Sequence, residues 1–169
     1  RLIFSDRAVK SMMPRMLSSS ITVSTWKALD QSLTSRSDEL KQKAQARLYM
    51  YGYGKFGCSV MLTYDKILGV TLLVYQHGWS AVITCLPGDG TNGFRYERAG
   101  RKEFKICAHD AFATVAKDLV ERGVTEASKI VAAGASNGGL MAGMMLPRFP
   151  DRFAALACEL PLTDLRRFQ

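Results

Sequence analysis

The six residues Gly134-Ala135-Ser136-Asn137-Gly138-Gly139 form a G-x-S-x-G motif between two apolar runs. We expect the run before it, 129–133, to be a strand, and the run after it to lie in a helix over 138–146 that Pro147 closes. A strand, a tight glycine turn and a helix are the context of a nucleophile elbow, where the serine oxygen stands above the sheet edge. Small neighbours are needed there because backbone segments approach too closely for side chains. Ser136 is therefore the candidate nucleophile.

Alternating apolar patterns place this elbow in a larger α/β arrangement. Short apolar runs predict strands, at 48–51, 80–86, 129–133 and 153–158. An apolar stripe with helical spacing predicts a helix over 110–122 that Gly123 ends, whereas 67–75 is compatible with a strand or a helix. Strands that alternate with helices imply right-handed parallel crossovers. We therefore expect an α/β sandwich with a mainly parallel sheet, whose ligands bind at the carboxyl ends of the strands.

The chain divides near residue 47 into two parts. Residues 1–47 are rich in Ser, Lys and Arg, and we expect either a helix from about 25 to 46 or disorder, whereas 48–169 carries the α/β pattern. The net charge of the chain is +8. Residues 1–55, with 10 basic and 4 acidic residues, contribute +6 of this charge. A basic arm can bind nucleic acid or a membrane surface, but no aromatic residues interleave with the charges, so we favour a solvated segment. The acid-poor stretch 7–27 also loosely resembles an organelle transit peptide.

Composition excludes several classes of protein. Hydrophobic residues make up 47% and charged residues 22%, as in ordinary globular proteins. No apolar stretch approaches the roughly 20 residues that a membrane helix needs. The four cysteines have no C-x-x-C pairing, so we expect reduced thiols, with Cys85 and Cys158 buried in apolar runs, and no metal site. We expect a cytoplasmic protein without membrane or nucleic-acid partners, with organelle targeting as the alternative.

A serine nucleophile needs stabilisation of the oxyanion and a general base. The backbone N–H of Asn137 would lie at a helix N-terminus, where a donor can hold an oxyanion. Tyr53 lies in an alternating Tyr-Gly stretch directly after a strand, and its hydroxyl can supply a second donor. Both histidines, His77 and His109, precede the serine, although in this fold class the histidine follows it. The nucleophile is thus predicted without its base.

Several motifs together resemble the catalytic domain of the prolyl oligopeptidase family. The two main ones are Tyr51-Gly52-Tyr53-Gly54-x-Phe56 and Gly134-x-Ser136-Asn137-Gly138-Gly139-Leu140. Further matches follow in order: Leu86 to Gly93 in place of an Arg-Gly-Gly-Gly-Glu-x-Gly loop, Ala99-Gly100, Asp110 with Phe112, Arg148 to Phe153, and Leu162-Thr163-Asp164-Leu165. The resemblance covers roughly 48–168 and implies an incomplete α/β-hydrolase domain. It is specific because independent motifs agree in order.

The resemblance implies a serine peptidase that cleaves short proline-containing peptides after proline through an acyl-enzyme. Ser136 matches the nucleophile, Asn137 the backbone oxyanion donor, Tyr53 the oxyanion hydroxyl, and Phe56 an apolar residue near the substrate pocket. No cofactor or metal is implied. The family's catalytic Asp and His would lie beyond Gln169, so we expect the chain to be inactive alone. Its partners would be the substrate peptides and either the missing C-terminal part or a β-propeller domain.

Departures from the family leave two alternatives open. Lys55 stands where the family has Gly, its Arg-Gly-Gly loop appears as Pro87-Gly88-Asp89, and residues before 47 do not match. These changes and the missing base favour a degenerate, non-catalytic member that acts as a binding or regulatory piece. A general esterase of the same fold is the other alternative, which the Tyr-Gly and Ser-Asn motifs match poorly.

Overall fold

The computed structural model of the chain describes residues 21–24, 47–59, 73, 76–164 and 166–167, with the backbone alone at 21–24 and 103. The helix expected at 25–46 and most of the ambiguous stretch 67–75 lie outside the described residues. Among the elements whose bounds the structure describes, three strands come first and two α-helices come next. A strand, a helix and a final strand complete the order, with short 3₁₀ helices between them.

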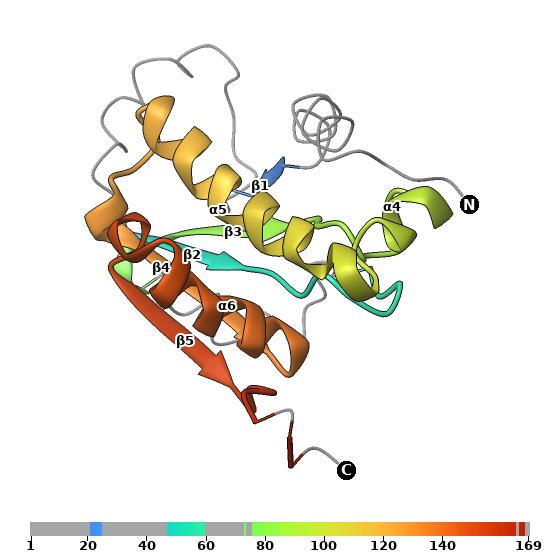
Figure 1. Cartoon of the computed structure of the whole chain (residues 1–169). Coiled ribbons are helices and arrows are strands. Elements are labelled where there is room, and N and C mark those ends of the chain that lie inside the picture. The colour runs from blue at the N-terminus through green and yellow to red at the C-terminus, as the bar shows by residue number, and fades with distance from the viewer. Residues whose placement is uncertain (1–20, 25–46, 60–72, 74–75, 165, 168–169) are drawn as a thin grey trace.

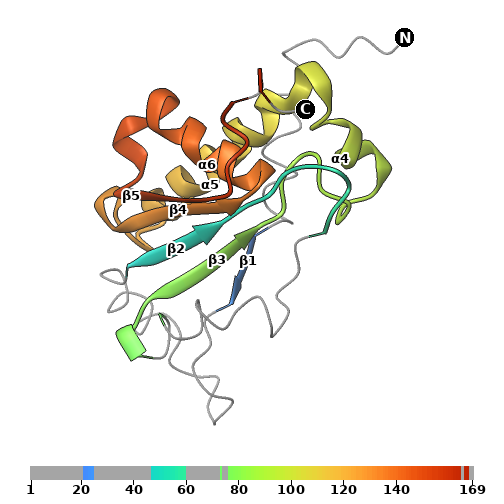
Figure 2. The same cartoon turned by 90° about the horizontal axis from the view of Figure 1, so that it is seen from below.

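Five strands form a single sheet at the centre of the described part. They are β1 (Ile21–Ser24), β2 (Leu48–Tyr51), β3 (Ser80–Thr84), β4 (Ile130–Ala135) and β5 (Ala155–Glu159). Their order is β1-β3-β2-β4-β5, and Figure 2 shows them side by side. β3, β2, β4 and β5 pair in parallel, and only β1 is antiparallel, against β3. The predicted mainly parallel sheet is therefore confirmed.

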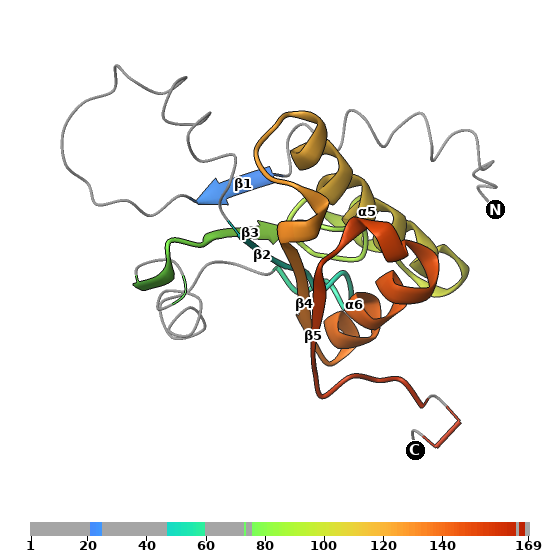
Figure 3. The same cartoon turned by 90° about the vertical axis from the view of Figure 1, so that its left-hand side faces the viewer.

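Two long helices, α5 (Lys105–Glu121) and α6 (Asn137–Arg148), pack on the same face of this sheet. Figures 1 and 3 show them together in one layer beside the strands. The steps from β3 to β4 and from β4 to β5 move across the sheet in the same direction, so right-handed crossovers put both helices on one side. The other helices whose bounds the structure describes are short: α4 (Phe94–Arg98), η2 (Lys102–Phe104), η3 (Ala127–Lys129) and η4 (Pro150–Arg152). No helix of the described part is long and apolar enough to cross a membrane.

The core lies between the sheet and this helix layer. Leu48 and Met50 alternate in β2 with the half-buried tyrosines, so one face of the strand is apolar and fully covered. Phe112 of α5 and Met141 and Met145 of α6 complete the packing, each at most 1% exposed. This packing sets the positions of both helix starts relative to the strand ends, where the elbow lies.

Element boundaries differ from the sequence expectation in explicable ways. α5 begins at Lys105, five residues earlier than expected, because a 3₁₀ turn leads into it without a capping side chain. α6 extends past Pro147 to Arg148, since a proline in the last turn still leaves the bond from Phe149 N–H to Met145 O at 2.8 Å. The stop at Gly123 is confirmed: its φ is 70°, and Val124 N–H bonds to Leu119 O at 3.0 Å.

Two elements were not expected from the sequence. β1 lies within the segment 1–47 and pairs with β3, from Ile21 opposite Thr84 to Ser24 opposite Ala81. The helix α4 follows the glycine turn at Gly93. Both are four or five residues long, too short to leave a clear periodic pattern.

The cysteines show one correction to the burial expected from the sequence. All four are free in the structure. Cys158, however, is exposed and Cys85 is half-buried, although both lie in apolar runs. Cys158 belongs to β5, which among the described strands pairs only with β4, so this edge strand has less cover than a central one.

Gly134 allows a close backbone approach at the elbow. A Cβ there would collide with the backbone of Gly138. We expect Gly134→Ala to lower the free energy of unfolding by about 1–3 kcal/mol or more, measured by urea denaturation. Gly143→Ala in α6 is the matched control, because its Cβ would meet nothing nearer than Cys158 Sγ at 3.8 Å. That helix substitution should be neutral or stabilise by about 0.5–1 kcal/mol. Equal destabilisation by both would contradict the close-approach argument.

Candidate active site

Ser136 occupies a strained turn between β4 and α6. Its backbone has φ 53° and ψ −113°, a region that residues with a side chain rarely adopt. The turn is held from both sides: Ser136 N–H donates to the Glu159 carbonyl in β5 at 2.9 Å, and Leu140 N–H donates to the Ser136 carbonyl at 3.1 Å. This geometry is that of a nucleophile elbow at the carboxyl end of the parallel sheet.

The segment after β2 lies directly against the elbow. β2 is the neighbour of β4, so the parallel strands bring their carboxyl ends to the same edge. A Cβ on Gly138 would collide with the Gly52 carbonyl, and Gly52 N–H donates to Ala133 O at 3.1 Å. Tyr53, the next residue, therefore lies just beyond the end of β2, and β2 is the neighbour of β4, which leads into Ser136.

Asn137 links the two segments through its side chain. Its Nδ2 donates to the Tyr53 carbonyl at 2.6 Å, and the residue is only 2% exposed. Its backbone N–H is at the first position of α6, where helix N–H groups have no carbonyl partner within the helix. The sequence had suggested a role for the backbone of Asn137 alone. The side-chain bond could not be inferred because it joins residues 84 positions apart.

Asp89 anchors the other side of the segment 52–57 that follows β2, which we call the Tyr53 turn. This fully buried carboxylate accepts hydrogen bonds from Gly54 N–H at 3.0 Å and from Leu86 N–H at 2.7 Å. Burial raises its pKa to about 6, although the backbone donors of Leu86, Gly54 and Lys55 act in the opposite direction. In the sequence, Asp89 was distinguished only as a departure from a family loop. The sequence offers one signal for this role, because Asp89 lies between two glycines, in a loop where a carboxylate can accept hydrogen bonds from backbone N–H groups.

The Tyr53 side chain is partly buried, and its hydroxyl group keeps its proton at neutral pH. Burial, and then the nearby Cys58 and Asp89, raise the pKa of this phenol above its usual value of 10. A protonated phenol is the form that can donate a hydrogen bond to an oxyanion. The pKa of Tyr51 is similarly raised, with burial as the largest cause, and a backbone hydrogen bond from Ala135 acts in the opposite direction.

Phe56 extends from the same turn toward solvent. It has φ 60° and is 62% exposed, and its ring centre lies 6.4 Å from that of Tyr53. Lys55 Nζ lies 4.8 Å from the centre of the Phe56 ring, a cation–π contact. The turn thus presents a phenol, an aromatic ring and an ammonium group within four consecutive residues.

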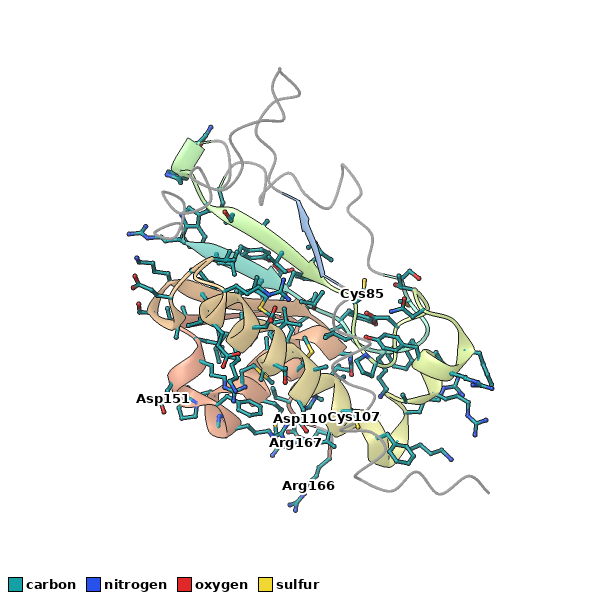
Figure 4. The ribbon with its side chains drawn as sticks, turned by 90° about the horizontal axis from the view of Figure 1, so that it is seen from above. Cys85, Cys107, Asp110, Asp151, Arg166 and Arg167 are labelled. Carbon is teal, nitrogen blue, oxygen red and sulfur yellow. The ribbon has the colours of Figure 1, made fainter. Side chains whose placement is uncertain are left out.

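Neither histidine is placed to serve Ser136. His77 is exposed and comes three residues before β3, so it lies at the amino edge of the parallel sheet, opposite the elbow. His109 is buried in α5 at 5% exposure, and neither ring nitrogen has a hydrogen-bond partner. Burial, with Lys105 and Arg148 nearby, lowers its pKa to about 4. Its neighbour Asp110, labelled in Figure 4, instead pairs with Arg148 at 2.7 Å.

Comparison with known proteins places this site in context. The family model described as "Prolyl oligopeptidase family" matches residues 68–169. The chain is 30% identical over 125 residues to a prolyl endopeptidase of Dictyostelium discoideum, which is 73% of this chain and 16% of that protein. It is 31% identical over 136 residues to a dual function macrocyclase-peptidase of Galerina marginata, covering 79% of this chain and 18% of that protein.

Solved structures agree with these relatives. The apo structure of prolyl oligopeptidase B from Galerina marginata superposes with a TM-score of 0.69 at 29% identity, over 75% of this chain and 18% of that one. A structure from a study of two prolyl endopeptidases gives a TM-score of 0.66 at 30% identity, over 73% and 18%. The chain therefore spans less than a fifth of the length of these relatives.

Replacing Asp89 tests its role as an anchor of the Tyr53 turn. Asn in place of Asp keeps the shape, but its NH₂ group faces one of the two N–H donors and leaves it unpaired. We expect Asp89→Asn to accelerate amide hydrogen exchange at Gly54 or Leu86 at pH 7.5. Asp151→Asn, at an exposed carboxylate, is the control and should change the exchange of neither amide. Unaltered exchange at both amides in Asp89→Asn would show that the carboxylate is dispensable for the turn.

The buried His109 predicts a loss of stability in acid. Its pKa falls from 6.5 to about 4 on folding, so the unfolded chain binds the proton first as the pH drops. Stability relative to His109→Leu should therefore fall between pH 6.5 and 4 by about 2–4 kcal/mol, as urea denaturation at several pH values measures. The exposed His77 provides the control, and His77→Leu should follow the wild-type curve. A pH-independent difference between wild type and His109→Leu would contradict the assignment.

Proposed function

Because the chain belongs to the prolyl oligopeptidase family, we propose that it forms the nucleophile and oxyanion part of a serine endopeptidase. The substrates would be short peptides, cut after proline by way of an acyl-enzyme. The relatives named above include a prolyl endopeptidase, and the Tyr-Gly and Ser-Asn motifs of this chain resemble those of the family.

The observation that carries the proposal is the strained backbone of Ser136 next to the Tyr53 turn. A φ of 53° at a serine persists only where the surroundings impose it, and such positions cluster at active sites. Here the Glu159 carbonyl and the glycines around the elbow impose it. The same edge of the sheet carries the start of α6 and, just beyond the end of the adjacent strand β2, the protonated phenol of Tyr53.

In the proposed reaction Ser136 Oγ attacks the carbonyl carbon after proline. The resulting oxyanion accepts hydrogen bonds from the Tyr53 hydroxyl and the Asn137 backbone N–H. Collapse of the intermediate releases the amine, which takes the proton that the base removed from the serine, and water then hydrolyses the acyl-enzyme. Phe56 would contact the substrate near its proline.

The general base in this proposal comes from outside residues 1–169. His77 lies at the opposite edge of the sheet, and the His109 imidazole is buried, with both nitrogens covered. A histidine from elsewhere in a longer polypeptide, or from a second chain, would have to approach Ser136. The lack of a suitably placed histidine within residues 1–169 would also suit a non-catalytic member of the family. The catalytic and the non-catalytic reading therefore differ only in whether Ser136 can be activated.

A fluorophosphonate probe distinguishes the two readings. A serine hydroxyl without a base is a weak nucleophile, so we expect little labelling of the chain alone and negligible hydrolysis of a proline-containing reporter peptide. Addition of the C-terminal segment of a complete relative, in trans or by fusion, should restore labelling. Mass spectrometry of the labelled peptide should place the adduct on Ser136.

Two controls complete this experiment. Ser136→Ala must abolish any restored signal, and Tyr53→Phe should lower the labelling rate by about 10–1000-fold if its hydroxyl holds the oxyanion. Absence of labelling in the fused protein would favour the non-catalytic reading. Strong labelling of the chain alone, lost in Ser136→Ala, would mean that a base exists within these residues.

A further inference from the structure

A cationic and aromatic surface surrounds the Tyr53 turn at the carboxyl edge of the sheet. It consists of side chains from this turn, from α4 and from the segment that leads into α5, and we call it the cationic rim: Lys55, Phe56, Phe94, Arg98, Arg101 and Lys105. Figure 2 shows α4 beside the loop that leaves β2, at the same edge. Neither the nucleophile nor the oxyanion donors account for this concentration of charge.

The members of the cationic rim form one continuous surface. A Cβ on Gly54 would lie 3.2 Å from Ala108 Cβ in α5, and one on Gly57 would lie 3.5 Å from Glu97 Cγ in α4, so the turn touches both helices. Within α4, Arg98 lies over the Phe94 ring at 5.6 Å from its centre, as Lys55 does over Phe56 at 4.8 Å. Two exposed aromatic rings, 69% and 62% accessible, thus each carry a cation.

Positive charges at this surface outnumber the acids beside them, since four cations (Lys55, Arg98, Arg101 and Lys105) lie here and, within the part that the structure describes, only Arg101 is paired, with Glu97. Burial, and then the charge of Lys55, lower the pKa of the Lys105 ammonium, so these two groups repel each other across the turn. Among the described side chains, Glu97 is bound to Arg101 at 2.5 Å and is 10% exposed, and Asp89 is enclosed by backbone donors. An anion placed between Lys55 and Lys105 would therefore relieve a repulsion that the folded chain contains.

We propose that the cationic rim binds acidic side chains of a peptide whose backbone extends past Ser136. The inference rests on the proposed function for the identity of the ligand as a substrate peptide. Two aromatic faces beside a few cations suit a short peptide that combines apolar and carboxylate groups, and the rim lies against the turn that holds Tyr53.

Fluorescence anisotropy with the full chain tests this proposal. The probe is a labelled Gly-Pro-Glu-Asp-Glu peptide, and the reference is its neutral counterpart Gly-Pro-Gln-Asn-Gln at equal ionic strength. The acidic peptide should bind at least about fivefold more tightly, because exposed ion pairs each contribute up to about 1 kcal/mol. Lys55→Glu and Arg98→Glu should each remove most of this preference, and added salt should weaken acidic-peptide binding in the wild type.

The control for net charge is Lys117→Glu on the exposed part of α5, which should leave the preference unchanged. Equal affinity for both peptides, or equal effects of all three substitutions, would overturn the proposal. Tighter binding of a 15-mer of single-stranded oligo-dT at the same rim would overturn it in favour of a nucleic-acid surface. Binding is measured without turnover, and Ser136→Ala should retain it, so a failed labelling experiment refutes the proposed catalysis without affecting this result.

Discussion

The contact between the Tyr53 turn and the start of α6 is the constraint on which the rest of the site depends. Asn137 Nδ2 bonds to the Tyr53 carbonyl, and Gly138 packs so closely on the Gly52 carbonyl that neither segment can shift alone. The strained φ of Ser136 persists because this contact on one side and the Glu159 carbonyl on the other hold it. The carboxyl ends of three neighbouring parallel strands, β2, β4 and β5, thereby hold Ser136 in place.

Two buried ionisable groups make this arrangement sensitive to pH in opposite ways. Asp89 has a raised pKa of about 6, so its contribution to stability falls as the pH rises from 3.8 to 6, while the unfolded chain ionises first. His109 has a lowered pKa of about 4, so its contribution falls as the pH drops below 6.5. Asp89 positions the Tyr53 turn by its two backbone bonds, whereas His109 makes no hydrogen bond that would offset its burial.

The edge of the sheet that carries Ser136 also carries the charge of the cationic rim. Lys55 and Phe56 belong to the turn that contains Tyr53, so groups suited to the reaction and groups suited to selection of a ligand share one short segment. In the proposed cleavage and in the proposed binding of acidic peptides, the same turn would meet the ligand. A change in that turn would therefore alter chemistry and specificity together.

The sequence by itself determined the elbow, the α/β class and the parallel strands, because these depend on local patterns: glycines around Ser136, apolar runs of strand length, and Gly123 as a helix stop. It also placed Tyr53 and Ser136 at strand ends, which a parallel sheet brings to one edge. Only the tertiary structure decided that β1 joins the sheet, that Asp89 binds the Gly54 N–H 35 residues away, and that Asn137 binds Tyr53 across 84 residues. Such long-range hydrogen bonds leave no periodic signal, because their partners meet only after the strands have paired and the helices have packed.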